Sequence, residues 1–379
     1  MTTSTTSSPR TGPAAAVRNW VERGGLRERR VLLLALIIVL LIVMKILGAA
    51  GLTNGNFNSD YLAGSLINFV PMALLALAEL FVILSGRGSI DLSVGSIVSV
   101  VGMVFGILFA EVGLPLVVSL IAAVLLGALL GAFNGLLTAY FGYPALITTL
   151  ATYYAYRAIA LIVTGASPIS GSRTQDLYTV ADSIELPLFG QYFPLVPLGV
   201  FTFLIPVAVV AWFVLNRTTY GRSLYGIGTN TTAAHWSGIN TRRTQMLAFV
   251  GSGAVAGLVG VYTVAQFASA RPDAGSSGAG MALPAITIAV LGGVAITGGV
   301  GRLSGILFAA LLITWLDASI LLVVPGNAGA QLQYLALGAV LLGASLVSGL
   351  PAGSFFRLRR RRPDEEQTGA EAAQPPPTQ

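Results

Sequence analysis

The most distinctive polar residues of this chain stand where a long apolar run begins. The string GSIDLSVGS occupies residues 88–96 and leads into that run. An aspartate at this place can accept a backbone amide of the first helical turn, and the positive end of the helix dipole favours its charge. We therefore interpret the string as a helix-capping motif, and a direct contact of Asp91 with a solute is the less favoured alternative. Its polar and turn-forming members are Ser89, Asp91, Ser93 and Gly95.

Three ionisable side chains, Glu79, Arg157 and Asp317, lie inside other apolar runs. Charges are costly in hydrocarbon, so such groups mark a solute path or pair with one another. Two interpretations of Arg157 stay open. It lines a path together with neighbouring tyrosines, as sugar sites often combine aromatic faces and polar groups, or it pairs with Glu79 and fixes helix register. The candidate path residues are Asn68, Glu79, Asn134, Tyr153, Tyr154, Arg157, Gln266, Thr297 and Asp317.

Membrane helices must position these residues. Only 9% of the residues are charged and the mean hydropathy is +0.80, which is too apolar for a soluble core of this size. A spanning helix needs about 20 apolar residues. Ten stretches near that length start close to Val31, Tyr61, Ile90, Pro115, Ala145, Phe193, Gln245, Leu283, Leu303 and Leu332. We predict an all-α, polytopic integral protein of the plasma (cytoplasmic or inner) membrane, with about ten transmembrane helices.

The distribution of positive charge predicts the orientation. With a cytoplasmic N-terminus, seventeen of the 21 lysines and arginines fall on the inner side and only Arg173 and Arg271 on the outer side. We therefore expect both termini to be cytoplasmic. We expect residues 1–30 to form a basic, largely disordered leader, residues 31–350 a transmembrane domain, and residues 351–379 a basic, then acidic and Pro-rich tail. This topology and contact with lipid headgroups explain the net charge of +6 without nucleic-acid binding.

The residue inventory excludes several chemistries. The chain has no cysteine and one histidine, so it lacks thiolate sites and a multi-histidine metal centre. A P-loop needs a lysine after its glycines, but the only lysine, Lys45, lies inside the first apolar run. We expect no metal and no cofactor on this chain, with any ATP and magnesium held by a separate subunit.

Glycines recur at helical spacing in two of the apolar runs. Gly127, Gly131 and Gly135 share one helix face, and residues 253, 257 and 260 repeat the pattern. Small residues let helix backbones approach closely in lipid. We interpret both faces as helix-packing surfaces. Two glycine turns that follow LAELFVILS and AITIAVL also resemble each other and suggest a duplicated unit.

The longest inner loop, residues 216–244, contains a short helix with recognisable ends. Asn230 or Thr231 can cap its start, and Gly238 suits the left-handed position after its end. Composition alone leaves two roles open, a helix lying on the membrane surface or a helix that docks on a partner. The segment consists of Asn230, Thr231, Thr232, Ala233, Ala234, His235, Trp236, Ser237 and Gly238.

Four strings together resemble the permeases of sugar-type ABC importers, which include the ribose, xylose and galactose transporters' membrane subunits. They are GSIDLSVGS, NGLLTAYFGYPALITTLAT (134–152), YGRSLYGIGTNTTAAHWSGIN (220–240) and LPAITIAVLGG (283–293). The order of the strings is also that of the family. The sequence departs from the family pattern at Glu79, Arg87, Pro284 and Asp317. The resemblance covers about residues 68–346.

This resemblance implies a permease subunit that imports a monosaccharide or related small polar solute. It implies ABC ATPase subunits, an extracytoplasmic solute-binding protein, and a second permease copy or homologue in the lipid bilayer. Residues 230–238 would be the coupling helix, and we expect Ala234→Glu to block docking of the ATPase. The alternatives are a proton-coupled carrier that uses the intramembrane ionisable groups, a passive channel, or an ABC permease for nucleosides or branched-chain amino acids.

Overall fold

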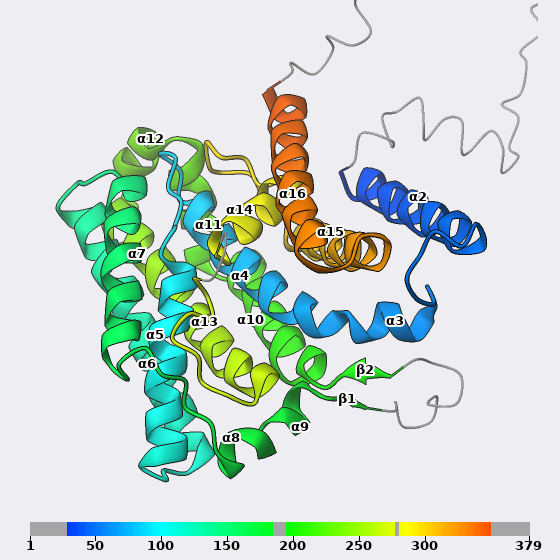
Figure 1. Ribbon diagram of the computed structural model, residues 1–379. Coiled ribbons are helices and arrows are strands. Elements are labelled where there is room, and N and C mark those ends of the chain that lie inside the picture. The colour runs from blue at the N-terminus through cyan, green and yellow to red at the C-terminus, as the bar shows by residue number, and fades with distance from the viewer. Residues whose placement is uncertain (1–28, 185–194, 277–279, 350–379) are drawn as a thin grey trace, which may run out of the picture.

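The computed structural model describes residues 29–184, 195–276 and 280–349, and these residues are almost entirely helical (Figure 1). Eight helices in the described part are long and apolar enough to cross a membrane. The prediction of an all-α, polytopic membrane protein is confirmed. The tail and nearly all of the predicted leader lie outside the described residues, so the position of the termini and the count of ten crossings stay predictions.

The helices of the first half, in chain order, are α2 Arg29–Ala49, α3 Ser59–Gly64, α4 Leu66–Leu84, α5 Val94–Gly106, α6 Leu116–Gly135, α7 Ala145–Ile162, α8 Ser172–Asp176 and α9 Tyr178–Ala181. A small hairpin pairs β1 Ser183–Ile184 with β2 Val196–Pro197. The second half comprises α10 Ile205–Arg217, α11 Thr219–Thr229, α12 Thr231–Trp236, α13 Thr241–Phe267, α14 Ala282–Leu291, α15 Leu303–Val323 and α16 Gly326–Gly349. Single π-helical turns extend α5 and α6 and precede α10.

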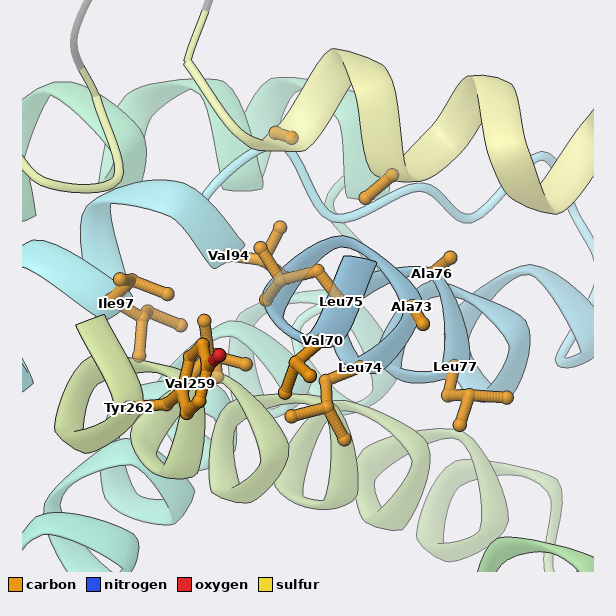
Figure 2. Packing of buried hydrophobic residues seen from close by; sticks show 14 of the residues in the cluster. Val70, Ala73, Leu74, Leu75, Ala76, Leu77, Val94, Ile97, Val259 and Tyr262 are labelled. Atoms are coloured by element: carbon orange, nitrogen blue, oxygen red, sulfur yellow. The ribbon is translucent and has the colours of Figure 1, made fainter. Parts of the chain in front are cut away.

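Helix α4 is the centre of the molecule. Every residue from Ala73 to Leu84 is buried, and α13, α14 and α15 pack around this helix. Figure 2 shows Val70 and Leu74 of α4 beside Val259 and Tyr262 of α13. Helices α2, α6, α7 and α10 instead expose rows of large apolar side chains. This contrast is expected of a bundle whose outer helices face lipid and whose inner helix faces only protein.

The predicted glycine faces pack against each other in the contact between α6 and α13. A methyl group added at Gly131 would collide with the carbonyl oxygen of Phe249, and one added at Gly253 would collide with that of Gly127. The two backbones therefore touch without intervening side chains. The interpretation of both faces as helix-packing surfaces is confirmed.

The span predicted to start near Leu283 is wrong as a continuous helix. Helix α14 has ten residues and is about 15 Å long, half the thickness of the hydrocarbon core. The irregular segment that precedes α14 in the sequence runs alongside α5. Ala270 pairs with Ile169 beside Gly106 at one end of α5, and Gly275 lies against Gly95 at the other end.

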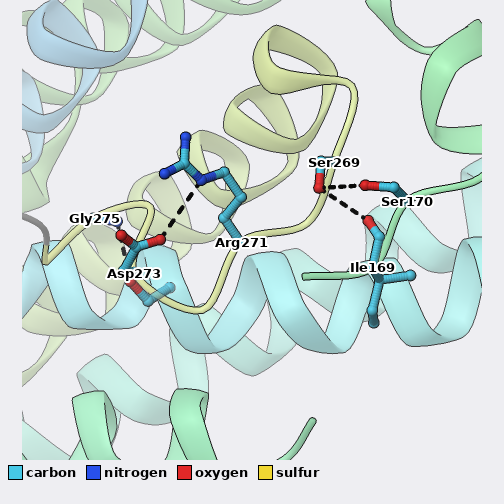
Figure 3. Close-up of polar contacts among 7 residues, drawn as sticks. Ile169, Ser170, Ser269, Arg271, Asp273 and Gly275 are labelled. Carbon is cyan, nitrogen blue, oxygen red and sulfur yellow. Dashed lines mark hydrogen bonds and ion pairs between the residues drawn. The ribbon is translucent and has the colours of Figure 1, made fainter. Parts of the chain in front are cut away.

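Figure 3 shows this segment between Ser269 and Gly275 running beside the helix that contains Gly95. The amide of Gly275 donates to Ser99 Oγ over 3.0 Å, so protein groups satisfy part of the irregular backbone. Non-helical backbone at membrane depth is tolerated only when it is buried in protein or lines a cavity. An irregular segment and a half-helix therefore replace the predicted span.

We predict that Gly253→Ala destabilises the protein by about 1–3 kcal/mol, because its methyl group overpacks a backbone contact. Gly251→Ala is the matched control, since it lies on the same helix and a methyl group there meets nothing within 4 Å. Thermal unfolding of both variants in detergent micelles measures the difference. Equal melting temperatures would contradict the glycine contact between α6 and α13.

Candidate functional site

A buried hydrogen-bond network surrounds Asp91 at the start of α5. Its side chain has no exposed surface. Asp91 Oδ1 accepts the amide of Ser93 over 3.0 Å and its hydroxyl over 2.6 Å, and Oδ2 accepts the hydroxyl of Ser252 over 3.4 Å. The predicted acceptance of a first-turn amide is therefore present. Ser93 itself occupies the cap position of α5, so Asp91 acts from two residues earlier.

Three further helices bind the same short segment. Asn134 of α6 donates to Ser93 Oγ over 2.7 Å, Thr149 of α7 donates to the carbonyl of Ile90 over 3.1 Å, and Gln245 of α13 donates to Ser89 Oγ over 3.1 Å. Asn134 is fully buried, so its predicted role as a path residue would require an opening that this conformation lacks. The network joins residues 89–93 to α6, α7 and α13.

Sequence reasoning missed three members of this network, Thr149, Gln245 and Ser252. Each is a polar residue of a predicted membrane helix, and each is buried. Polar side chains in apolar helices often hydrogen-bond to neighbouring helices, and this is the signal that could have found them. Their partners could not be read from the sequence, because the contacts span 59 to 161 residues.

The ion pair between Glu79 and Arg157, one of the two interpretations left open for Arg157, is not formed. Glu79 has no exposed surface, and its Oε2 accepts the amide of Asp91 over 3.3 Å, while Arg157 is exposed on α7. The reason is helix rotation. Tyr156 points inward and donates to the carbonyl of Leu130 over 3.0 Å, so the next residue faces outward.

The aromatic residues near Arg157 lie on the same side of α7. The rings of Tyr153 and Tyr154 meet edge to face at 5.2 Å, and Tyr154 is 62% exposed. Residues three and four positions apart share a helix face, so both tyrosines neighbour Arg157. This group lies on the outer surface of the chain, where it would face lipid or another subunit, and it does not contact the Asp91 network.

Two other predicted path residues meet although they are 198 positions apart. Gln266, near the end of α13, donates to Asn68 Oδ1 at the start of α4 over 2.7 Å. Tyr262, one turn earlier on α13, donates to the carbonyl of Ile67 over 3.0 Å. Asn68 is exposed, and Gln266 Oε1 is a buried acceptor without a partner in the described part of the chain. This pair lies at the end of α4 opposite residues 86–93.

The last two path candidates lie elsewhere. Thr297 is exposed in the turn between α14 and α15, next to glycines that contact the end of α4. Asp317 lies on α15, where its carbonyl accepts Gln333 of α16 over 2.9 Å. The structure therefore does not assemble Glu79, Arg157 and Asp317 into a continuous relay. No group of three residues that could hold a metal ion occurs among the described residues.

Helix α12 has the predicted ends. Asn230 Oδ1 accepts the amide of Ala233 over 2.9 Å, and Gly238 is left-handed with φ 86°. Its exposure pattern corrects one expectation. Ala234 is only 5% exposed and faces the permease, so Ala234→Glu would disturb this chain rather than enter a partner's groove. Thr232, Ala233, His235 and Trp236 are exposed, and Trp236 is the largest of them, with 84% of its surface exposed.

We predict that Asp91→Ala lowers the stability of the protein by about 1–3 kcal/mol or more, because three buried donors lose their acceptor. The control is Asp60→Ala, which removes an exposed carboxylate from α3. Thermal unfolding in the same detergent compares the two. A melting temperature of Asp91→Ala equal to that of Asp60→Ala would show that the network is not structural.

Comparison with known proteins places this bundle in a family. The model of the family described as "Branched-chain amino acid transport system / permease component" matches residues 61–347. The chain is 31% identical to the autoinducer 2 import system permease protein LsrD of Enterobacter sp. (strain 638) over 314 residues, 82% of this chain and 92% of that protein. It is 32% identical to LsrD of Yersinia enterocolitica over 310 residues, 81% of this chain and 90% of that protein. No solved structure matches.

The family match runs from within α3 to within α16, so it includes the Asp91 network and the segment around α12 but not α2. The chain therefore belongs to the branched-chain amino acid transport system permease family, and it is a multi-pass inner-membrane permease of an ABC import system.

Proposed function

We propose that this chain is the permease subunit of an ATP-driven importer for a monosaccharide or sugar-like solute. The observation that carries the proposal is the rigid, outward presentation of Trp236 on α12. A tryptophan that is 84% exposed has little reason to lie on a free polar surface, whereas exposed tryptophans often anchor protein interfaces.

The surroundings of Trp236 support docking of an ATPase subunit there. The Asn230 cap fixes the start of α12, and buried Ala234 fixes its inner face. The exposed Arg222, Arg242 and Arg243 belong to the adjoining helices and add positive charge to this side. A pre-ordered helix loses little entropy on binding, which suits the transmission of a movement.

ATP and magnesium would be held by the partner. The only lysine, Lys45, donates to the carbonyl of Phe57 over 3.3 Å near the end of α2, and the residues of α2 that precede it include no glycine. A P-loop lysine must instead reach phosphates. We infer that this chain supplies the path and the docking helix, while hydrolysis occurs on the ATPase.

The solute class rests on the relatives and on the polar groups of the bundle. The relatives described above are import permeases for autoinducer 2. Asn68 and Gln266 form a polar pair near one end of the bundle, and such amide groups suit hydroxyl-rich solutes. We infer a sugar or a sugar-like solute, in preference to a nucleoside or a branched-chain amino acid.

We further infer that two permeases enclose the path. Tyr153, Tyr154 and Arg157 face outward from one chain, and an arginine in a membrane helix requires a partner or water. A second copy or a homologous permease against α7 would meet this requirement. An extracytoplasmic binding protein would deliver the solute. A proton-coupled relay is not supported, because its three ionisable groups are not together.

We predict that Trp236→Ala weakens binding of the ATPase subunit by about 2 kcal/mol or more, because the variant removes the main exposed apolar anchor. The stability of the permease should not change, since Trp236 makes little contact with its own chain. Binding to permease in nanodiscs measures the affinity. Trp212→Ala, which removes a tryptophan from the surface of α10, is the control. Normal binding by Trp236→Ala would reject α12 as the docking helix.

The transport test uses proteoliposomes that contain this permease, the ATPase and the binding protein. Autoinducer 2, D-ribose and D-galactose are the sugar-like probes, and leucine and adenosine represent the alternatives. We expect uptake of a sugar-like probe that requires ATP and the binding protein and persists when the proton gradient is collapsed. Uptake driven by the proton gradient without ATP would overturn the proposal, and uptake of leucine or adenosine alone would overturn the solute class.

A further inference from the structure

Three turns of backbone meet at one point on the side of the bundle that carries α12. They are Gly86 after α4, Gly228 in the last turn of α11, and Gly298-Gly299 between α14 and α15. A Cβ atom added at Gly86 would lie 2.8 Å from Gly228 Cα. One added at Gly228 would overlap the carbonyl oxygen of Leu84 and the amide of Gly299. The backbones are therefore in direct contact, and we call this contact the glycine joint.

The positions require glycine for two different reasons. Gly86, Gly298 and Gly299 have φ values of 81°, 93° and 72°, so their backbone conformation itself favours glycine. Gly228 lies within a right-handed helix and does not have a positive φ. Only the neighbouring backbones exclude a side chain there. A substitution at Gly228 therefore tests the contact without adding backbone strain.

Hydrogen bonds join the two turns to each other and α11 to the second turn, and packing holds α11 against α4. The amide of Gly299 donates to the carbonyl of Leu84 over 3.2 Å, and Tyr225 of α11 donates to the carbonyl of Gly301 over 2.8 Å. Leu224 and Ile227 are buried in the same core as α4. Two residues after Gly228, Asn230 caps α12. No flexible segment separates α12 from the glycine joint.

The two turns lead to different parts of the permease. The turn at Gly86 continues into residues 89–93, which bind α6, α7 and α13 through the Asp91 network. The turn at Gly298-Gly299 follows α14, the half-helix of the broken span, and precedes α15. A displacement of α11 would therefore reach both regions at once.

We propose that Gly228 is a positioning residue for energy coupling, and that the glycine joint moves as one rigid unit with α12. When the docked ATPase moves, the turn at Gly86 and the turn at Gly298-Gly299 then shift together. This inference rests on the proposed docking of an ATPase on α12, and adds which residues receive the movement. The hinge of the transport cycle lies outside the joint.

The test compares Gly228→Ala with Gly226→Ala. Both glycines belong to α11, but a methyl group at Gly226 meets only Ile239 Cδ1 at 3.6 Å, an ordinary contact. The chain has no cysteine, so Asn68→Cys introduces a single thiol at an exposed position at the far end of the bundle. The rate of its reaction with a membrane-impermeant maleimide is measured in the complex with the ATPase, with and without ATP and vanadate.

We expect ATP to change the reaction rate about tenfold in the Asn68→Cys parent and in Gly226→Ala, and Gly228→Ala to lose most of this change. The ATPase should still bind to Gly228→Ala and hydrolyse ATP, which a merely misfolded variant would not support. A normal response of Gly228→Ala would overturn the inference. A parent that does not respond to ATP contradicts the proposed ATP-driven function itself, and this inference with it.

Discussion

The bilayer sets the constraint on which the rest of this structure depends: backbone polar groups at membrane depth must find partners within the protein. The chain breaks helical structure twice beside α5, at residues 89–93 before it and at residues 270–276 along it. Protein groups satisfy part of both breaks. Residues 89–93 bind α6, α7 and α13 through the Asp91 network, while Gly275 touches Gly95 of α5 and donates its amide to Ser99. Helices α6, α7 and α13 also pack against α5.

Close packing of small residues makes this cover possible. In lipid, the hydrophobic effect does not drive helices together, so their association relies on close contact and on hydrogen bonds. The glycines of α6 and α13 let these two helices touch at backbone distance, and Asn134 of α6 and Ser252 of α13 then reach the Asp91 network. The buried network and the glycine faces therefore belong to one packing arrangement.

Close backbone contact also joins the elements on the side of the molecule that carries α12. Gly86, Gly228 and Gly299 bring α4, α11 and the turn before α15 together, and Trp236 is exposed on the adjoining α12. In the proposed docking, Trp236 would supply the surface that binds the ATPase, and these backbone contacts would connect that surface to α4 and α15.

The sequence by itself predicted the class of protein, most of its spans, the glycine faces and the ends of α12, because hydropathy, spacing and capping are local properties. Only the tertiary structure decided that Arg157 faces outward while Glu79 is buried, since helix rotation depends on partners such as Leu130 for Tyr156. It also decided that Ala234 faces inward, that Gln266 meets Asn68, and that a half-helix replaces one span. These features arise from contacts between residues far apart in the chain, and an apolar run shows neither where its helix stops nor which neighbour each face will meet.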